Sequence, residues 1–334
     1  MRNRILYSVF IVVVAALTMA PAVFGGQDER ASQVLAKSRK AIGEKKLDAL
    51  KALSVEAAVV RNINTMQISS DVELLLELPD KYVRTDQPNA PGMIASGMTS
   101  GFNGDRPIQP VQGGFAGGGA MVIRMGGPMP PSDAPKLSPG EQAKLEASVV
   151  RGQKQELSRF MLGWFAAAHP SLGAQYTFAG EAESPDGRAY VLDVRTADGF
   201  AARLFIDQQT NLPLMLTYQG PQRQVVMAGG PGHATAGGGT HGGGAAQGGT
   251  VKPSTDEERK RAQEGAQRQV AELQKQAPVM VDYTLYFEDW QPVDGVQFPR
   301  KIRRASGGAT TEEWTINKVR INPTIDPKKF AVKS

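Results

Sequence analysis

The clearest pattern in the chain is a nearly unbroken alternation of apolar and polar residues between positions 66 and 78. One parity carries Met66, Ile68, Val72, Leu74, Leu76 and Leu78, and the other carries Gln67, Ser69, Asp71, Glu73 and Glu77. Because successive side chains of a strand point to opposite faces, this pattern predicts a strand in an antiparallel sheet that is covered on one face. At roughly 3.3 Å per residue the strand would be about 40 Å long, long enough for the sheet to wrap around something.

Further strands are predicted from runs of strand-forming residues, which are connected by residue pairs typical of tight turns. The turn pairs are Asp186-Gly187, Asp198-Gly199, Asp294-Gly295 and Gly307-Gly308, and such pairs suit hairpins because both central residues need a positive φ. The runs cover residues 53–61, 81–86, 189–196, 201–207, 214–219, 279–288, 296–304 and 311–321. Since no crossover helices separate most of them, we expect about nine or ten strands in one antiparallel sheet.

Three helices are also expected, two of them between these strands and one before the first strand. Ser138 and Glu141 form one S-x-x-E capping box, and Ser254 and Glu257 form another. The first of these helices carries an apolar stripe made of Leu145, Val149, Leu157, Phe160, Met161, Trp164 and Phe165. That stripe either packs on the sheet or forms part of a lid over a cavity, whereas the helix after Ser254 has a thin stripe and is expected to be exposed. The third helix covers residues 31–42 and ends at Gly43.

The N-terminus has the three parts of a secretory signal peptide. Arg2 and Arg4 precede an apolar run over residues 5–16, and the small-residue triplet Ala20-Pro21-Ala22 follows. A transmembrane anchor is the alternative, but it needs about 20 uninterrupted apolar residues, and this run covers only residues 5–16. We therefore expect a signal peptide over residues 1–22, a soluble periplasmic protein, and no integral membrane span in the mature chain.

Residues 23–334 are expected to form a single domain that contains two insertions. Residues 87–137 are rich in glycine, proline and methionine, and most of this segment cannot build a packed core. Residues 221–277 contain a glycine-rich linker followed by the charged helix after Ser254.

Composition and charge exclude several classes of protein. The chain has no cysteine, which rules out disulfides, thiolate metal sites and a lipid-bearing cysteine. The net charge of +5 falls to about +3 once Arg2 and Arg4 are removed, which is too small to indicate nucleic-acid binding. The basic residues after position 298 fit either solvated outer faces of the sheet or contact with anionic lipid head groups.

Signatures of catalysis are missing from the sequence. Of the three histidines, His233 and His241 lie in the glycine-rich tract and His169 precedes a proline, so no paired metal spacing exists. No G-x-S-x-G elbow is present. Glu312 and Glu313 are neighbours in a strand and must point to opposite faces. We therefore expect no catalytic residues, no metal and no cofactor.

Several short motifs occur in an order that is typical of one family. They are a helix over residues 34–43, Leu78-Pro79-Asp80-Lys81-Tyr82, Phe102-Asn103-Gly104-Asp105, Leu204-Phe205-Ile206-Asp207, Asn211-Leu212-Pro213-Leu214, Asp294-Gly295-Val296-Gln297-Phe298-Pro299 and the segment 322–330. Over residues 28–86, 156–220 and 278–334 the chain resembles the LolA/LolB-like superfamily of periplasmic lipoprotein carriers and their uncharacterised relatives. The resemblance implies a mainly β (α+β) fold, a strongly curved antiparallel half-barrel of about 9–11 strands with helices covering its concave face.

The same resemblance implies that the concave face holds acyl chains. Two positions depart from the lipoprotein carriers, because Leu78 stands where they have an arginine and Arg106-Pro107 follows Gly104-Asp105 where a tryptophan is common. It therefore implies binding of a lipid, an acyl chain or another apolar ligand rather than of lipoproteins in particular.

We take the apolar parity of the strands as the candidate ligand-binding surface. Its residues are Ile68, Val72, Leu74, Leu76, Leu78, Leu204, Ile206, Tyr283 and Leu285. The expected function is that of an exported carrier or binding protein for an apolar ligand in the cell envelope. The alternative is a non-enzymatic periplasmic interaction or envelope-stress sensing module with an envelope protein as partner.

Overall fold

The fold is that of a computed structural model. It describes residues 24–63, 66–89, 98–109, 120–124, 138–185, 187–222, 224–228 and 279–333. The expected signal peptide, the glycine-rich tract and the helix after Ser254 lie outside the described residues. Among the described residues no helix is both long and apolar enough to cross a membrane.

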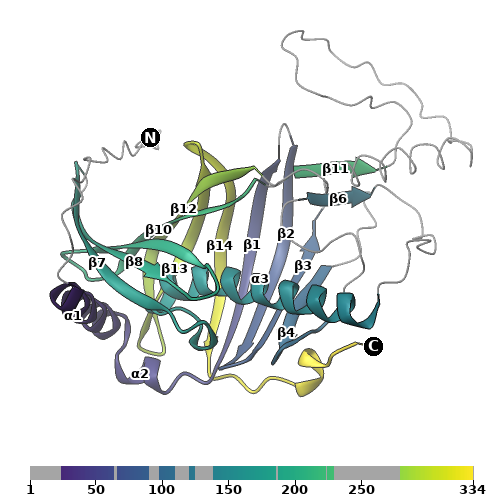
Figure 1. Cartoon of the computed structure of the whole chain (residues 1–334), viewed down its shortest axis with the longest axis horizontal. Helices are drawn as coiled ribbons and strands as arrows, with labels where there is room; N and C mark the ends of the chain where they lie inside the picture. The colour runs from purple at the N-terminus through teal and green to yellow at the C-terminus, as the bar shows by residue number, and fades with distance from the viewer. Residues whose placement is uncertain are drawn as a thin grey trace, which may run out of the picture.

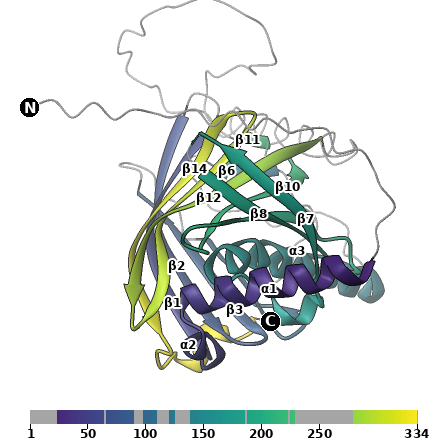
Figure 2. The same ribbon diagram turned by 90° about the vertical axis from the view of Figure 1, so that its left-hand side faces the viewer.

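Twelve strands form one open antiparallel sheet. Along the sheet the order is β5-β4-β3-β2-β1-β14-β13-β12-β10-β9-β8-β7, so β5 and β7 are its two edges. The strands are β1 (Ala52–Ile63), β2 (Met66–Glu77), β3 (Lys81–Pro88), β4 (Met98–Asn103), β5 (Arg106–Pro107), β7 (Gln175–Ser184), β8 (Gly187–Arg195), β9 (Ala201–Asp207), β10 (Pro213–Pro221), β12 (Met280–Val293), β13 (Val296–Ser306) and β14 (Ala309–Ile321). The sheet bends strongly without closing (Figures 1 and 2), which confirms the expected half-barrel.

A few shorter elements complete the chain. The helices are α1 (Phe24–Ile42), α2 (Lys45–Asp48), α3 (Pro139–Phe165), and the 3-10 turns η1 (Pro170–Leu172) and η2 (Pro327–Phe330). Strands β6 (Ala120–Arg124) and β11 (Gln224–Ala228) pair in parallel as a separate two-stranded sheet. Helix α3 lies inside the curve of the main sheet, and α1 crosses in front of the opening beside β7 (Figure 2).

The side chains of strand β2 are buried as its alternation predicts, and one residue of the opposite parity is buried as well. Val72, Leu74 and Leu76 are buried on the concave face, while Asp71 on the opposite parity is exposed. Leu75 is also buried, because the C-terminal segment crosses the outer face there and packs Phe330 against it. The C-terminal segment therefore gives part of the convex face its own small core.

The capping box at Ser138 is formed. The Ser138 hydroxyl accepts from the backbone N–H of Glu141, whose carboxylate in turn accepts from the Ser138 backbone. The helix ends at Phe165, and Ala166 adopts the left-handed conformation that follows many helix ends. Of the two alternatives for the apolar stripe, packing on the sheet is the arrangement found.

Three strands of the main sheet, and the two strands of the small sheet, were not expected from the sequence. β4 and β5 lie within the first predicted insertion, so that part of residues 87–137 extends the sheet edge next to β3. β7 pairs with β8 at the other edge, and most of its residues are only half-buried.

The turn pairs Asp294-Gly295 and Gly307-Gly308 have the positive φ values that tight hairpins need.

Candidate functional site

The nine predicted ligand-binding residues lie on the inner side of the sheet, and most of them form one cluster. Seven belong to the main hydrophobic core, namely Val72, Leu74, Leu76, Leu204, Ile206, Tyr283 and Leu285. Leu78 packs against that core, whereas Ile68 is half-buried and lies outside it. The structure thus brings eight of the nine together, and their contact with a ligand remains a prediction.

Helix α3 covers this apolar face with aromatic side chains. The ring of Trp164 lies 5.3 Å from that of Phe160 and 5.2 Å from that of Phe298 on β13. Phe160 also contacts Trp314 on β14, with ring centroids 5.2 Å apart. A close approach occurs at Gly163, where an added Cβ would lie 1.9 Å from the ring of Phe287. The absence of a side chain at Gly163 is what lets α3 sit so close to β12.

Two cavities occur elsewhere in the described part of the chain. One, of about 370 Å³, is lined by Asp289, Gln291, Arg300, Lys301, Thr315, Ile316 and Asn317. The other, of about 260 Å³, lies beside α3 and is lined by Asp105, Ala147, Val150, Arg151, Lys154, Ser171, Leu172 and Asp198. Neither is lined by any of the nine residues, seven of which pack with residues of α3 in the main hydrophobic core.

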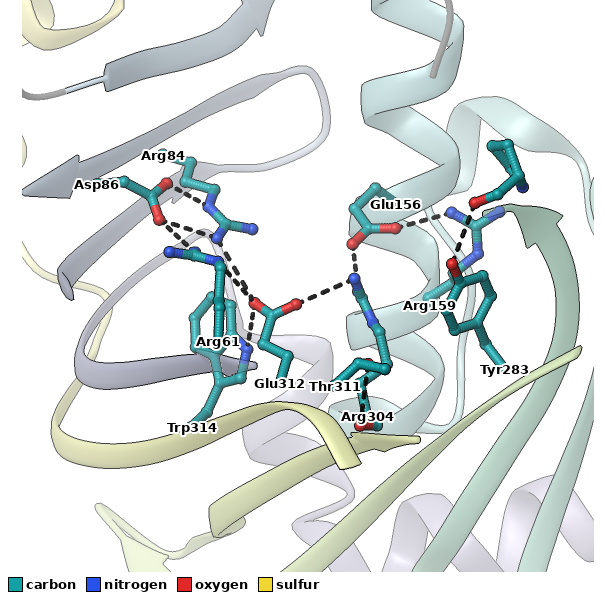
Figure 3. Close-up of polar contacts among 11 residues, drawn as sticks. Arg61, Arg84, Asp86, Glu156, Arg159, Tyr283, Arg304, Thr311, Glu312 and Trp314 are labelled. Carbon is teal, nitrogen blue, oxygen red and sulfur yellow. Dashed lines mark hydrogen bonds and ion pairs between the residues drawn. The ribbon is translucent and has the colours of Figure 1, made fainter. Parts of the chain in front are cut away.

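An ion-pair network with a buried centre, Arg61, Arg304 and Glu312, lies next to the apolar face (Figure 3). Its members are Arg61, Arg84, Asp86, Glu156, Arg159, Arg304 and Glu312. Glu312 is at its centre, 3.1 Å from Arg304, 3.6 Å from Arg61 and 3.8 Å from Arg84. The Glu312 carboxylate also accepts a hydrogen bond of 2.9 Å from the indole of Trp314.

The network connects the sheet to α3. Glu156 on α3 lies 2.5 Å from Arg304 on β13 and 2.8 Å from Arg159 one turn along the helix. The guanidinium of Arg159 stacks 4.3 Å above the ring of Tyr218 on β10. Glu156 therefore joins the helix to the inner surface of the sheet through an ion pair whose partner, Arg304, is only 3% exposed.

Two members of the network, Arg304 and Asp86, are held in their charged forms by their neighbours. Burial alone would lower the pKa of Arg304, but the attraction of Glu156 and Glu312 outweighs it and raises that pKa well above the ordinary value. Burial alone would raise the pKa of Asp86, but Arg84 and Arg61 hold it below its usual range. Four arginines and three carboxylates then leave the network with one net positive charge.

Sequence reasoning missed this network, although a signal was present. The basic residues after position 298 were expected on outer sheet faces or at lipid head groups, yet Arg304 shares the buried parity of Phe298 and Ile302. Glu312 shares the parity of Trp314 and is buried, while Glu313 points outward as expected. Charged residues on the apolar parity of a strand are the signal that could have found it.

His169 is buried beside α3 as a neutral imidazole. Its backbone N–H donates to the Ser158 hydroxyl, and its Nδ1 lies 2.7 Å from the Oγ of Ser171. Burial, followed by the repulsion of Lys154, lowers the pKa of His169 to about 4, against smaller opposing effects of Pro79 and Asp80. The native state thus binds fewer protons here than the unfolded chain between about pH 4 and pH 6.5.

This difference predicts a pH-dependent loss of stability. As the pH falls from 6.5 to 4, unfolding becomes easier, because only the unfolded histidine takes up a proton. His169→Asn, which keeps a cap for η1, should reduce that loss of unfolding free energy by about 2 kcal/mol. Urea denaturation of both proteins at pH 7 and pH 4 measures it, and parallel pH profiles would contradict the assignment.

The described residues contain no group of three or more histidines and carboxylates placed to hold a metal ion.

No family model matches the sequence, and no curated protein matches it. Among solved structures, the LolA superfamily protein NE2245 from Nitrosomonas europaea is 11% identical with a TM-score of 0.45, over 90% of this chain and 97% of that chain. A domain described for outer membrane lipoprotein sorting from Vibrio parahaemolyticus is 10% identical with a TM-score of 0.41, over 91% and 97%. A DUF1329 family protein from Desulfovibrio piger is 10% identical with a TM-score of 0.37, over 90% and 96%. Solved structures similar to this chain thus include a member of the superfamily that its sequence resembles.

Proposed function

We propose that the protein is an exported carrier or binding protein for a lipid, an acyl chain or another apolar ligand in the periplasm. The observation that carries the proposal is the nature of the layer that covers the concave face. Helix α3, with α1 beside β7 and β13, covers the concave apolar face, where a β-sandwich would place a second sheet. A helix whose backbone hydrogen bonds are internal can move away as a unit, and the apolar face is then available to a ligand.

The chemistry of the face supports an apolar occupant. Leu74, Leu204 and Leu285 present aliphatic side chains from strands distributed over the whole sheet. Burying such a surface in contact with an acyl chain removes apolar area from water, at roughly 25 cal/mol per Å². The signal-peptide pattern at residues 1–22 supports export of such a carrier to the cell envelope.

Leu285→Trp tests the proposal directly. The larger side chain occupies the space that an acyl chain would take, so we expect at least about tenfold weaker binding of a fluorescent fatty acid. Leu214→Trp is the matched control, because Leu214 lies on the neighbouring strand β10 and its side chain is 40% exposed. Fluorescence titration of the wild type and both folded variants measures the effect.

A second experiment searches for the native ligand in the purified wild-type protein. Organic extraction of the protein purified from the periplasm, followed by mass spectrometry, should release a stoichiometric apolar compound. An empty protein that binds no fatty acid would contradict the proposal, and stoichiometric co-purification of an envelope protein would then favour the interaction module.

A further inference from the structure

The ion-pair network has an excess of positive charge and depends on α3 for one of its carboxylates. Glu156 is the carboxylate that α3 supplies, and it pairs with both Arg304 and Arg159. Withdrawal of α3 would take Glu156 and Arg159 away together, and Arg304 would then keep Glu312 as its acidic partner. A buried guanidinium that loses a partner costs several kcal/mol unless another anion replaces it.

The arginines of the network retain unused hydrogen-bond donors. The Nε of Arg304 and the Nε of Arg159 are buried and have no hydrogen-bond partner among the described residues. A guanidinium offers five N–H donors in a fixed planar arrangement that matches carboxylate and phosphate oxygens. An anion with several acceptor oxygens could therefore use donors that Glu156 leaves unpaired.

The network is continuous with the apolar face. In β13 and β14 the pair Arg304 and Glu312 is followed, two residues along each strand, by the pair Ile302 and Trp314 on the same face. Two residues of a strand span roughly 7 Å. A ligand whose apolar part lies on the aliphatic and aromatic residues would thus place a terminal charged group at Arg304.

We propose that the ligand is an amphiphile with a terminal anionic group, a carboxylate or a phosphate monoester, which takes the place of Glu156 beside Arg304. This inference rests on the proposed function and adds the chemical class of the ligand. Glu156 then acts as an internal substitute for the ligand's headgroup while α3 covers the sheet. An uncharged amphiphile with the same chain lacks this interaction.

The test compares hexadecanoic acid, hexadecyl phosphate and hexadecanol in competition with a fluorescent fatty acid. We expect the acid or the phosphate to bind at least about tenfold more tightly than the alcohol. Glu156→Gln, which neutralises the internal competitor, should increase this preference. Arg304→Gln should decrease it, and Arg203→Gln on the outer face of β9 should leave it unchanged.

The ratio of the affinity for the acid or the phosphate to that for the alcohol reports on recognition of the anionic group. A loosened core would change the binding of all three compounds alike and leave this ratio unchanged. Equal affinities of the three compounds for the wild type would overturn the inference and leave the carrier function intact. An unchanged ratio in both Glu156→Gln and Arg304→Gln would also overturn it. Binding of none of the three would overturn the proposed function itself, and the inference with it.

Discussion

Replacing Arg304 with methionine lowers the free energy of unfolding by about 3–5 kcal/mol. Methionine fills much of the volume but leaves Glu312, which is 2% exposed, without its nearest cation, and it removes the ion pair to Glu156. The cost of an uncompensated buried charge is the reason for this magnitude. Urea denaturation at pH 7 measures the change from the shift of the midpoint at a constant slope.

The neighbouring residue in β13 provides the control. Arg303 points to the outer face, where it lies 3.5 Å from Glu288 with its side chain 31% exposed. Because surface ion pairs contribute little, Arg303→Met should cost no more than about 1 kcal/mol. Equal losses at positions 303 and 304 would mean that the network does not hold α3 to the sheet.

The parts of the fold that follow from local patterns could be predicted from the sequence. The strand of Leu74 and Leu76 is specified by alternation, the start of α3 by Ser138 and Glu141, and the hairpin at Asp294-Gly295 by its turn chemistry. β7 could not be predicted in this way, because an edge strand with Gly180 in a bulge has no regular burial pattern.

The candidate site could be predicted only in its apolar part. Alternation separates two faces without showing which one is concave, and the packing of α3 decides that. Arg84 and Asp86 lie two residues apart in β3, and Arg61 and Arg304 lie directly opposite Glu312 in the strands next to β14, so these pairs depend only on strand register. The pair of Glu156 and Arg304 joins residues 148 positions apart in the chain, and it has no local spacing to recognise.

Trp164→Ala is expected to lower the free energy of unfolding by about 3–5 kcal/mol, as do other large aromatic truncations in cores. The indole is fully buried between Phe160 and Phe298, so its removal leaves a cavity between α3 and the sheet. Trp164→Phe should cost less, because it keeps one ring and removes an indole N–H that has no hydrogen-bond partner among the described residues.

The cavity left by Trp164→Ala also reports on the face that the ligand would use. An apolar cavity that is closed to water binds small apolar molecules, so a saturating concentration of benzene should raise the melting temperature of Trp164→Ala and not that of the wild type. Trp290→Ala is the control, because its half-buried indole donates to the Phe287 carbonyl near the end of β12. Equal stability losses for Trp164→Ala and Trp290→Ala, without stabilisation by benzene, would show that α3 does not seal the concave face.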